Sequence, residues 1–138
     1  MDLLLKNKVI VTTGSSKGLG MACAQALLEE DAEVIISSRS LEHLESASTA
    51  LFKNCGKLPH IYQVDVSHKE EIEVFKEKII KKHGRVDGLL INAGGPPTGD
   101  CLDVDEEMWQ QSLGTNLLSE VWLTKAFVPE MIKEYLDI

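Results

Sequence analysis

The sequence predicts an α/β protein in which helices cover both faces of a parallel sheet. Short apolar runs rich in β-branched residues alternate strictly with amphipathic stretches. Each of these runs is almost continuously apolar, which is typical of a parallel strand buried on both faces. With 138 residues and no linker-like tract, residues 1–138 are interpreted as a single domain.

Four strands and three helices are expected in the first two thirds of the chain. The strands are predicted at residues 8–13, 33–38, 60–64 and 87–92. The helices are predicted at 18–30, at 41–52 after the cap Ser40, and at 68–83 after the cap Ser67. The apolar face of the first helix is expected to comprise Leu19, Ala22, Cys23, Ala26 and Leu27.

The last third is expected to be a loop followed by a long helix. Glycines and prolines at 94–99 exclude a regular element there, and the chain reads as helical from Asp105 almost to its end. Pro129 is expected to kink or interrupt this helix. The expected apolar stripe comprises Leu117, Val121, Lys125, Val128 and Ile132, widened by Leu118, Trp122 and Met131.

Composition excludes several classes of protein. The net charge of −8 argues against nonspecific nucleic-acid binding, which needs a basic surface. No apolar run approaches the length of a membrane span, and the first residues do not resemble a signal peptide. Three widely spaced cysteines are interpreted as reduced thiols of a cytoplasmic protein. The four histidines are expected on the solvated surface, so no metal site is predicted.

A glycine-rich segment joins the first predicted strand to the first predicted helix. Its residues are Thr13, Gly14, Ser15, Ser16, Lys17, Gly18, Leu19 and Gly20. Gly14 permits the tight turn out of the strand, Gly18 leaves room for phosphates, and Gly20 permits close packing of the helix. The exposed amides at the start of the helix then favour a pyrophosphate, so residues 14–20 are predicted to bind a dinucleotide.

The end of the second strand indicates which dinucleotide is bound. Sites for NAD usually carry an acidic residue here, whereas this chain reads Ser37-Ser38-Arg39-Ser40. Arg39 and Ser40, with Lys17 opposite, suit the 2′-phosphate of NADP(H). The alternatives are that both cations are ordinary surface residues, or that the loop serves a methyltransferase, whose cofactor would favour an acid at this position.

Four motifs in order resemble the short-chain dehydrogenases/reductases. They are Thr13-Gly14-x-x-x-Gly18-x-Gly20, Asp65-Val66, Asn92-Ala93-Gly94 and Thr115-Asn116-Leu117. The resemblance implies a Rossmann-type three-layer fold with strand order 3-2-1-4 and contacts from Asp65 and Val66 to adenine. It also implies that Asn92, Ala93 and Gly94 line the cofactor cleft, and that Asn116 is the asparagine of the catalytic tetrad. Among subgroups, the sequence most resembles the 3-oxoacyl-acyl-carrier-protein reductases.

The family's remaining catalytic groups have no counterpart in this sequence. The tyrosine that acts as general acid stands four residues before a lysine, and neither Tyr62 nor Tyr135 has that lysine. No catalytic serine is assigned either, so the chain is expected to be truncated before the catalytic segment and inactive alone. Asp100, Asp103 and Asp105 are the nearest other proton carriers, and they are interpreted as loop and helix-start residues.

The expected architecture leaves two surfaces available for association. The fourth strand becomes a sheet edge, and the last helix resembles one that family members use in dimers. A homo-oligomer through either surface is therefore predicted. Two alternatives remain open: an active oxidoreductase completed by another chain for a carbonyl or hydroxyl substrate, and a non-catalytic oligomeric scaffold. The sequence does not separate a natural half-length protein from a truncated product.

Overall fold

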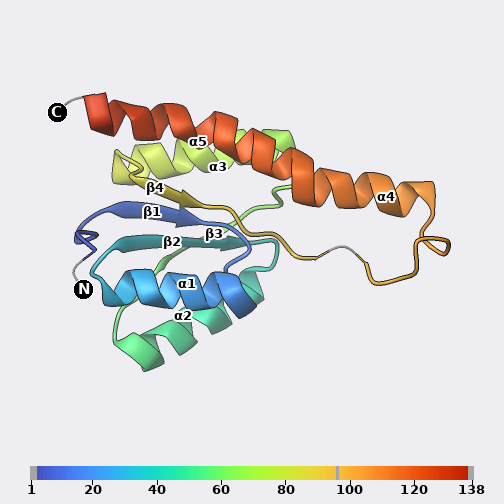
Figure 1. The fold of residues 1–138 in the computed structure, drawn as a ribbon. Helices are drawn as coiled ribbons and strands as arrows, with labels where there is room; N and C mark the ends of the chain where they lie inside the picture. The colour runs from blue at the N-terminus through green and yellow to red at the C-terminus, as the bar shows by residue number, and fades with distance from the viewer. Residues whose placement is uncertain (1–2, 96, 137–138) are drawn as a thin grey trace.

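The computed structural model describes residues 3–95 and 97–136, and its centre is one parallel sheet with the strand order β3-β2-β1-β4 (Figure 1). The strands are β1 (Val9–Thr12), β2 (Glu33–Ser38), β3 (His60–Gln63) and β4 (Gly88–Leu90). The helices are α1 (Gly18–Glu29), α2 (Leu41–Cys55), α3 (Lys69–His83), α4 (Glu106–Leu113) and α5 (Ser119–Leu136). A π-helical segment, Gly114–Leu118, joins α4 to α5. Pro96 of the predicted loop and two residues at each terminus lie outside the described residues.

The sheet separates two apolar cores. Helices α1 and α2 cover one face, while α3 and α5 cover the other (Figure 1). Alternate residues of β1 point to opposite cores, so Val9 and Val11 pack toward α3 and α5, and Ile10 packs toward α1 and α2. This arrangement confirms the predicted three-layer α/β fold and its strand order.

Helix α1 buries a different face from the one expected. Its buried residues are Gly20, Ala24 and Leu28, whereas Leu19 is 81% exposed and Ala22 and Ala26 are exposed. The small residues Gly20 and Ala24 follow one another at helical spacing, and they allow the helix to lie close to the sheet. Close approach therefore decides the buried face, and the count of apolar residues is a poor guide to it.

Helix α5 also turns a different face to the core. The predicted stripe is largely outside, because Leu117, Val121 and Ile132 are all exposed. The buried side instead carries Ser119, Leu123, Ala126 and Phe127. The helix runs through Pro129 without interruption. Phe127 and Met131, on either side of the proline, pack against the α3-side core.

Smaller differences concern the ends of elements. Strands β1, β3 and β4 are shorter than predicted, and α2 continues to Cys55. The N-cap of α3 is His68, so the prediction that Ser67 caps this helix is wrong. The Ser67 hydroxyl instead donates to the Asp65 carboxylate at 2.6 Å. A nearer carboxylate thus competes successfully for the hydroxyl that would have capped the helix.

Candidate nucleotide site

A cleft of about 930 Å³ lies at the carboxyl ends of the strands. Ligands of open parallel sheets bind in this position, outside the point where strand order reverses between β1 and β4. Most of the residues predicted to bind cofactor line the cleft: Gly14, Ser16, Lys17, Gly18, Leu19, Arg39, Ser40, Asp65, Val66, Asn92, Ala93 and Gly94. Asn116 lines it as well. Of the predicted set, Ser15 and Gly20 lie behind the cleft wall.

The three glycines have distinct surroundings. Gly14 has φ +55°, and a Cβ there would meet the Asn92 carbonyl oxygen at 2.5 Å. A Cβ on Gly20 would collide with the Gly14 carbonyl oxygen, so α1 presses directly on the loop. Gly18 has φ +58° and open space around its missing Cβ. Gly18 thus leaves a cradle at the start of α1 in which a phosphate can approach the backbone amides.

Ser15 anchors the glycine loop to β2. The side chain is buried, and its hydroxyl donates to the Thr12 carbonyl at 2.9 Å and accepts from the Ser37 amide at 3.0 Å. The Ser15 amide donates to the Ser37 carbonyl at 3.1 Å. These bonds hold the glycine loop against β2, and binding of the cofactor by Ser15 stays a prediction.

Asn92 ties the loop after β4 to the loop after β1. Its amide side chain donates to the Gly14 carbonyl at 2.9 Å. Its backbone N–H donates to the Thr13 hydroxyl at 3.0 Å, and that hydroxyl donates to the Asn92 carbonyl at 2.9 Å. Three hydrogen bonds therefore fix the two strand ends that frame the floor of the cleft.

A positively charged corner stands where β2 ends. Lys17 and Arg39 both line the cleft, and within the described residues neither side chain has a carboxylate at ion-pair distance. Ser40 caps α2 by accepting from the His43 amide at 3.2 Å, and both residues of this N-terminus line the same cleft. Two unpaired cations beside a helix N-terminus favour a dianionic group.

Asp65 lines the cleft just beyond the end of β3, the strand next to β2. Burial raises the pKa of Asp65, but hydrogen bonds from the Ser67 side chain and backbone, with the charges of His68 and Arg39, outweigh burial and hold that pKa below its ordinary value. The group is therefore a fixed carboxylate at neutral pH, able to accept a hydrogen bond from an exocyclic amine.

The π-helical segment brings a second wall to the cleft. Asn116 lies within it, and the Asn116 amide donates to the Ser112 carbonyl at 3.0 Å. Ser119 donates in the same way to the Thr115 carbonyl, so side chains satisfy carbonyls that the wider turn releases. Sequence reasoning missed the other residues that this wall contributes, which are Gln111, Ser112 and Thr115. Gly114, in a stretch otherwise read as helix, was the available signal.

The three aspartates before α4 do not join the cleft. Asp105 caps α4 by accepting from the Met108 amide at 2.8 Å, while Asp100 and Asp103 are exposed. Their interpretation as loop and helix-start residues agrees with these positions.

The expectation that all four histidines are solvated is wrong for His83. Its side chain is only 4% exposed, and its ring lies beside His60 with a centroid separation of 4.5 Å. The two histidines are 23 residues apart in sequence, on different elements. Spacing along the chain therefore gave no indication of this pairing.

The fold and the cleft together define a class. A parallel sheet covered on both faces, with a glycine loop that opens a helix at the carboxyl edge, is a Rossmann-type nucleotide-binding fold. The family model described as short chain dehydrogenase matches residues 8–135. The chain belongs to the short-chain dehydrogenase family.

Relatives of known sequence carry several names. Dehydrogenase/reductase SDR family member 4 from Bos taurus is 38% identical over 130 residues, which are 94% of this chain and 46% of the relative. Uncharacterized oxidoreductase Lmo0432 from Listeria monocytogenes is 30% identical over 132 residues, which are 96% of this chain and 53% of that protein. The chain thus spans about half the length of the curated relatives it matches.

Solved structures agree with the fold. L-sorbose reductase from Gluconobacter frateurii, complexed with NADPH and L-sorbose, has a TM-score of 0.88 at 29% identity, over 97% of this chain and 51% of that one. A Shigella flexneri 2a protein complexed with NADP has a TM-score of 0.86 at 26% identity, over 96% and 57%. Among the described residues, no helix is long and apolar enough to cross a membrane.

Proposed function

We propose that this chain binds NADP(H) in the cleft and forms the nucleotide-binding portion of an oxidoreductase acting on a carbonyl or hydroxyl group. The observation that carries the proposal is the pair of cations, Lys17 and Arg39, that face the cleft without carboxylate partners among the described residues. The complexes of L-sorbose reductase with NADPH and of the S. flexneri protein with NADP support it.

Each part of the cleft suits one part of the dinucleotide. The amides at the start of α1, beside the open space at Gly18, would hold the pyrophosphate. Arg39 and Lys17 would bind the 2′-phosphate, and Asp65 would accept from the adenine amine. Asn92 to Gly94 would line the nicotinamide half, while Asn116 would hold a water near it. The bound cofactor supplies hydride chemistry.

Binding is proposed to occur without turnover. Within residues 1–138, Tyr62 is followed four residues on by Val66 in place of the family's lysine, and none of the three aspartates Asp100, Asp103 and Asp105 lines the cleft. The resemblance to 3-oxoacyl-acyl-carrier-protein reductases stays a prediction, because the matched relatives named above carry other names. An oxidoreductase completed by a second chain remains the alternative for the active form.

Calorimetric titration with NADPH and with NADH tests the cofactor. Saturable binding that favours NADPH is expected. Arg39→Asp should weaken NADPH about tenfold or more, since a hydrogen bond to a charged group contributes about 1.5–3 kcal/mol. The affinity for NADH should change little. Lys125→Asp is the matched control, because it alters charge equally on an exposed part of α5. Equal losses for both nucleotides in Arg39→Asp would reject the 2′-phosphate assignment.

Oxidation of NADPH with an acetoacetyl thioester or L-sorbose tests the absence of turnover. No oxidation above the rate without enzyme is expected for the chain alone. Turnover by the chain alone would contradict the proposal. A rate in the mixture above that of an added full-length family member alone would favour completion by another chain.

A further inference from the structure

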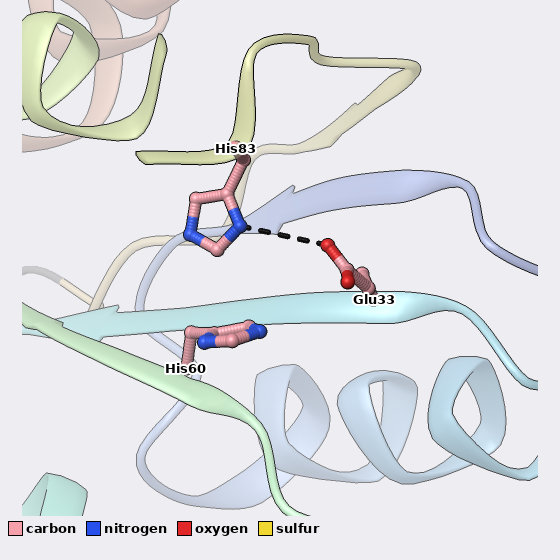
Figure 2. A group of neighbouring side chains, drawn as sticks. All are labelled: Glu33, His60 and His83. Carbon is pink, nitrogen blue, oxygen red and sulfur yellow. Dashed lines mark ion pairs between the residues drawn. The ribbon is translucent and has the colours of Figure 1, made fainter. Parts of the chain in front are cut away.

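Three potential metal ligands meet at the amino ends of the strands, opposite the cofactor cleft. Glu33 is the first residue of β2, His60 the first of β3, and His83 the last of α3. Parallel strands start at the same edge of the sheet, and Ile35 pairs with His60 in the β2–β3 register. Figure 2 shows the His83 ring above Glu33 and His60, on the face of the sheet that α3 covers.

The spacing of the three side chains suits a shared cation. One ligand atom from each residue lies within 4.8 Å of the other two. The His83 Nδ1 and a Glu33 carboxylate oxygen are 3.5 Å apart. That separation is long for a hydrogen bond, which is about 2.7–3.2 Å. It is close to the roughly 3.4 Å expected between two ligands of a tetrahedral ion that binds each at about 2.0–2.2 Å.

Tyr62 orients the buried imidazole. The Tyr62 hydroxyl lies 3.3 Å from His83 Nε2, on the side of the ring away from Glu33. The direction of this hydrogen bond depends on the imidazole tautomer. In the tautomer that carries its proton on Nε2, the ring donates to the Tyr62 hydroxyl and the Nδ1 lone pair faces the Glu33 carboxylate, an arrangement that a cation between the two atoms would stabilise. Metal-binding histidines characteristically have such an outer hydrogen bond on the second nitrogen.

The environment allows a metal ion to enter and remain. The His83 side chain is 4% exposed, whereas that of Glu33 is 53% exposed, so the site is closed on the protein side and open on the other.

We propose that Glu33, His60 and His83 form a zinc site with a water as the fourth ligand. Two imidazoles and one carboxylate are a donor set that Zn²⁺ accepts in proteins. The ion would join β2, β3 and α3 at their meeting point. Its expected role is structural, because the site lies at the edge of the sheet opposite the nucleotide cleft.

Metal titration of the chelator-treated, untagged protein tests the proposal directly. Zn²⁺ is expected to bind one per chain by calorimetry, and Co²⁺ is expected to give the visible absorption of a tetrahedral complex. Zn²⁺ should also raise the Tm. His60→Gln and Glu33→Gln should each lower the affinity at least tenfold and reduce the Tm shift. Tyr62→Phe should lower the affinity about 10–100-fold, as loss of an outer-sphere partner does.

His68→Gln is the matched control. His68 also has carboxylates nearby, at 3.6 Å from Asp65 and 3.8 Å from Glu71, but its side chain is 61% exposed and all three residues lie within one short segment. Zn²⁺ affinity should be unchanged in this variant. Absence of binding by the parent protein, or loss of binding in His68→Gln with retention in His60→Gln, would overturn the proposal. In that case His83 Nδ1 carries a proton toward Glu33, and Tyr62 donates to Nε2.

Circular dichroism of each apo variant separates loss of a ligand from loss of the fold. Glu33→Gln is the most informative variant for this purpose, because the Glu33 side chain is exposed and glutamine has the same shape as glutamate. A folded Glu33→Gln protein that binds Zn²⁺ as tightly as the parent would remove the carboxylate from the site and overturn the assignment.

Discussion

Asp87, just before the start of β4, accepts hydrogen bonds from several donors. Its side chain is 7% exposed and accepts from the Val9 amide at 2.9 Å, from the Arg85 guanidinium, and from Lys8 at 3.4 Å. Burial raises the pKa of Asp87, but these hydrogen bonds and charges outweigh burial and hold that pKa below its ordinary value. Arg85 also pairs with Glu134 of α5 at 3.1 Å, so Asp87 indirectly joins the sheet to that helix.

Asp87→Asn should destabilise the protein by about 1–3 kcal/mol at pH 7, the usual effect of losing charged hydrogen bonds. An acid with a lowered folded-state pKa stabilises fully above its unfolded pKa of about 3.9, and loses that contribution as pH falls through the folded value. The difference between parent and variant should therefore shrink below about pH 4. Urea unfolding at several pH values measures it, with the exposed Asp103→Asn as control. A difference independent of pH would contradict the role of the charge.

Two adjacent serines should separate stability from binding. Ser15→Ala removes the buried hydroxyl that bonds Thr12 and Ser37, so it should lower the free energy of unfolding by about 1–3 kcal/mol and change NADPH affinity little. Ser16→Ala changes a half-buried residue of the cleft wall. This substitution should lower the affinity for NADPH and leave the free energy of unfolding unchanged. Denaturant unfolding measures the stability of both variants, and calorimetry measures their affinity for NADPH. The reverse pattern would indicate that Ser15 contacts the cofactor.

At the scale of the element, α5 offers a sharp contrast between its two faces. Phe127 is fully buried and lies 5.7 Å from the Phe75 ring of α3, edge to face. Phe127→Ala should lower the free energy of unfolding by about 3–5 kcal/mol. Ile132→Ala, on the exposed face, should change it by no more than about 0.5 kcal/mol. Thermal or denaturant unfolding compares the two variants. Equal losses in the free energy of unfolding would indicate that the face predicted from the sequence, which carries Ile132, is also packed in the core.

Some of these elements were predictable from the sequence, and others were not. Continuous apolar runs and a strand–glycine–helix turn predicted the four parallel strands and the glycine loop of the cleft, because these signals are local. The strand order and the contributions of residues 65–66, 92–94 and 116 to the cleft were implied by the resemblance to the short-chain dehydrogenases/reductases. Helix orientation in α1 and α5 was mispredicted, since the buried face depends on how closely Gly20 and Phe127 approach other elements. The π-helical turn and the pairing of His60 with His83 depend on contacts that spacing along the chain does not encode.

The predicted self-association would use the exposed side of α5 or the sheet edge formed by β4. Leu117, Val121 and Ile132 are exposed, and within the described residues β4 pairs only with β1. Homo-oligomer formation stays a prediction. Light scattering over a range of concentrations should give a mass above that of one chain, and Val121→Glu should lower it if α5 is the contact. A single-chain mass at every concentration would contradict the prediction.

At the scale of the whole molecule, the two proposed sites lie at opposite ends of the same strands. Glu33 and Ser38 mark the two ends of β2, which are about 16 Å apart at roughly 3.3 Å per residue. NADPH at a hundredfold its Kd should add about 2.7 kcal/mol to the free energy of unfolding, and Zn²⁺ likewise. The two increments should add to within about 0.5 kcal/mol, because the sites share no ligand. Unfolding with each ligand and with both measures the coupling.

The bonds between Thr13 and Asn92 bear on whether the glycine loop could be transplanted into another protein. The Asn92 backbone supplies a donor and an acceptor to one hydroxyl, and its side chain supports the Gly14 carbonyl. The loop's shape is therefore completed by a residue 78 positions away. A designer who grafts residues 13–20 alone would carry over the glycines without the strand end that holds them. The smallest portable unit is two neighbouring strands with both of their exit turns.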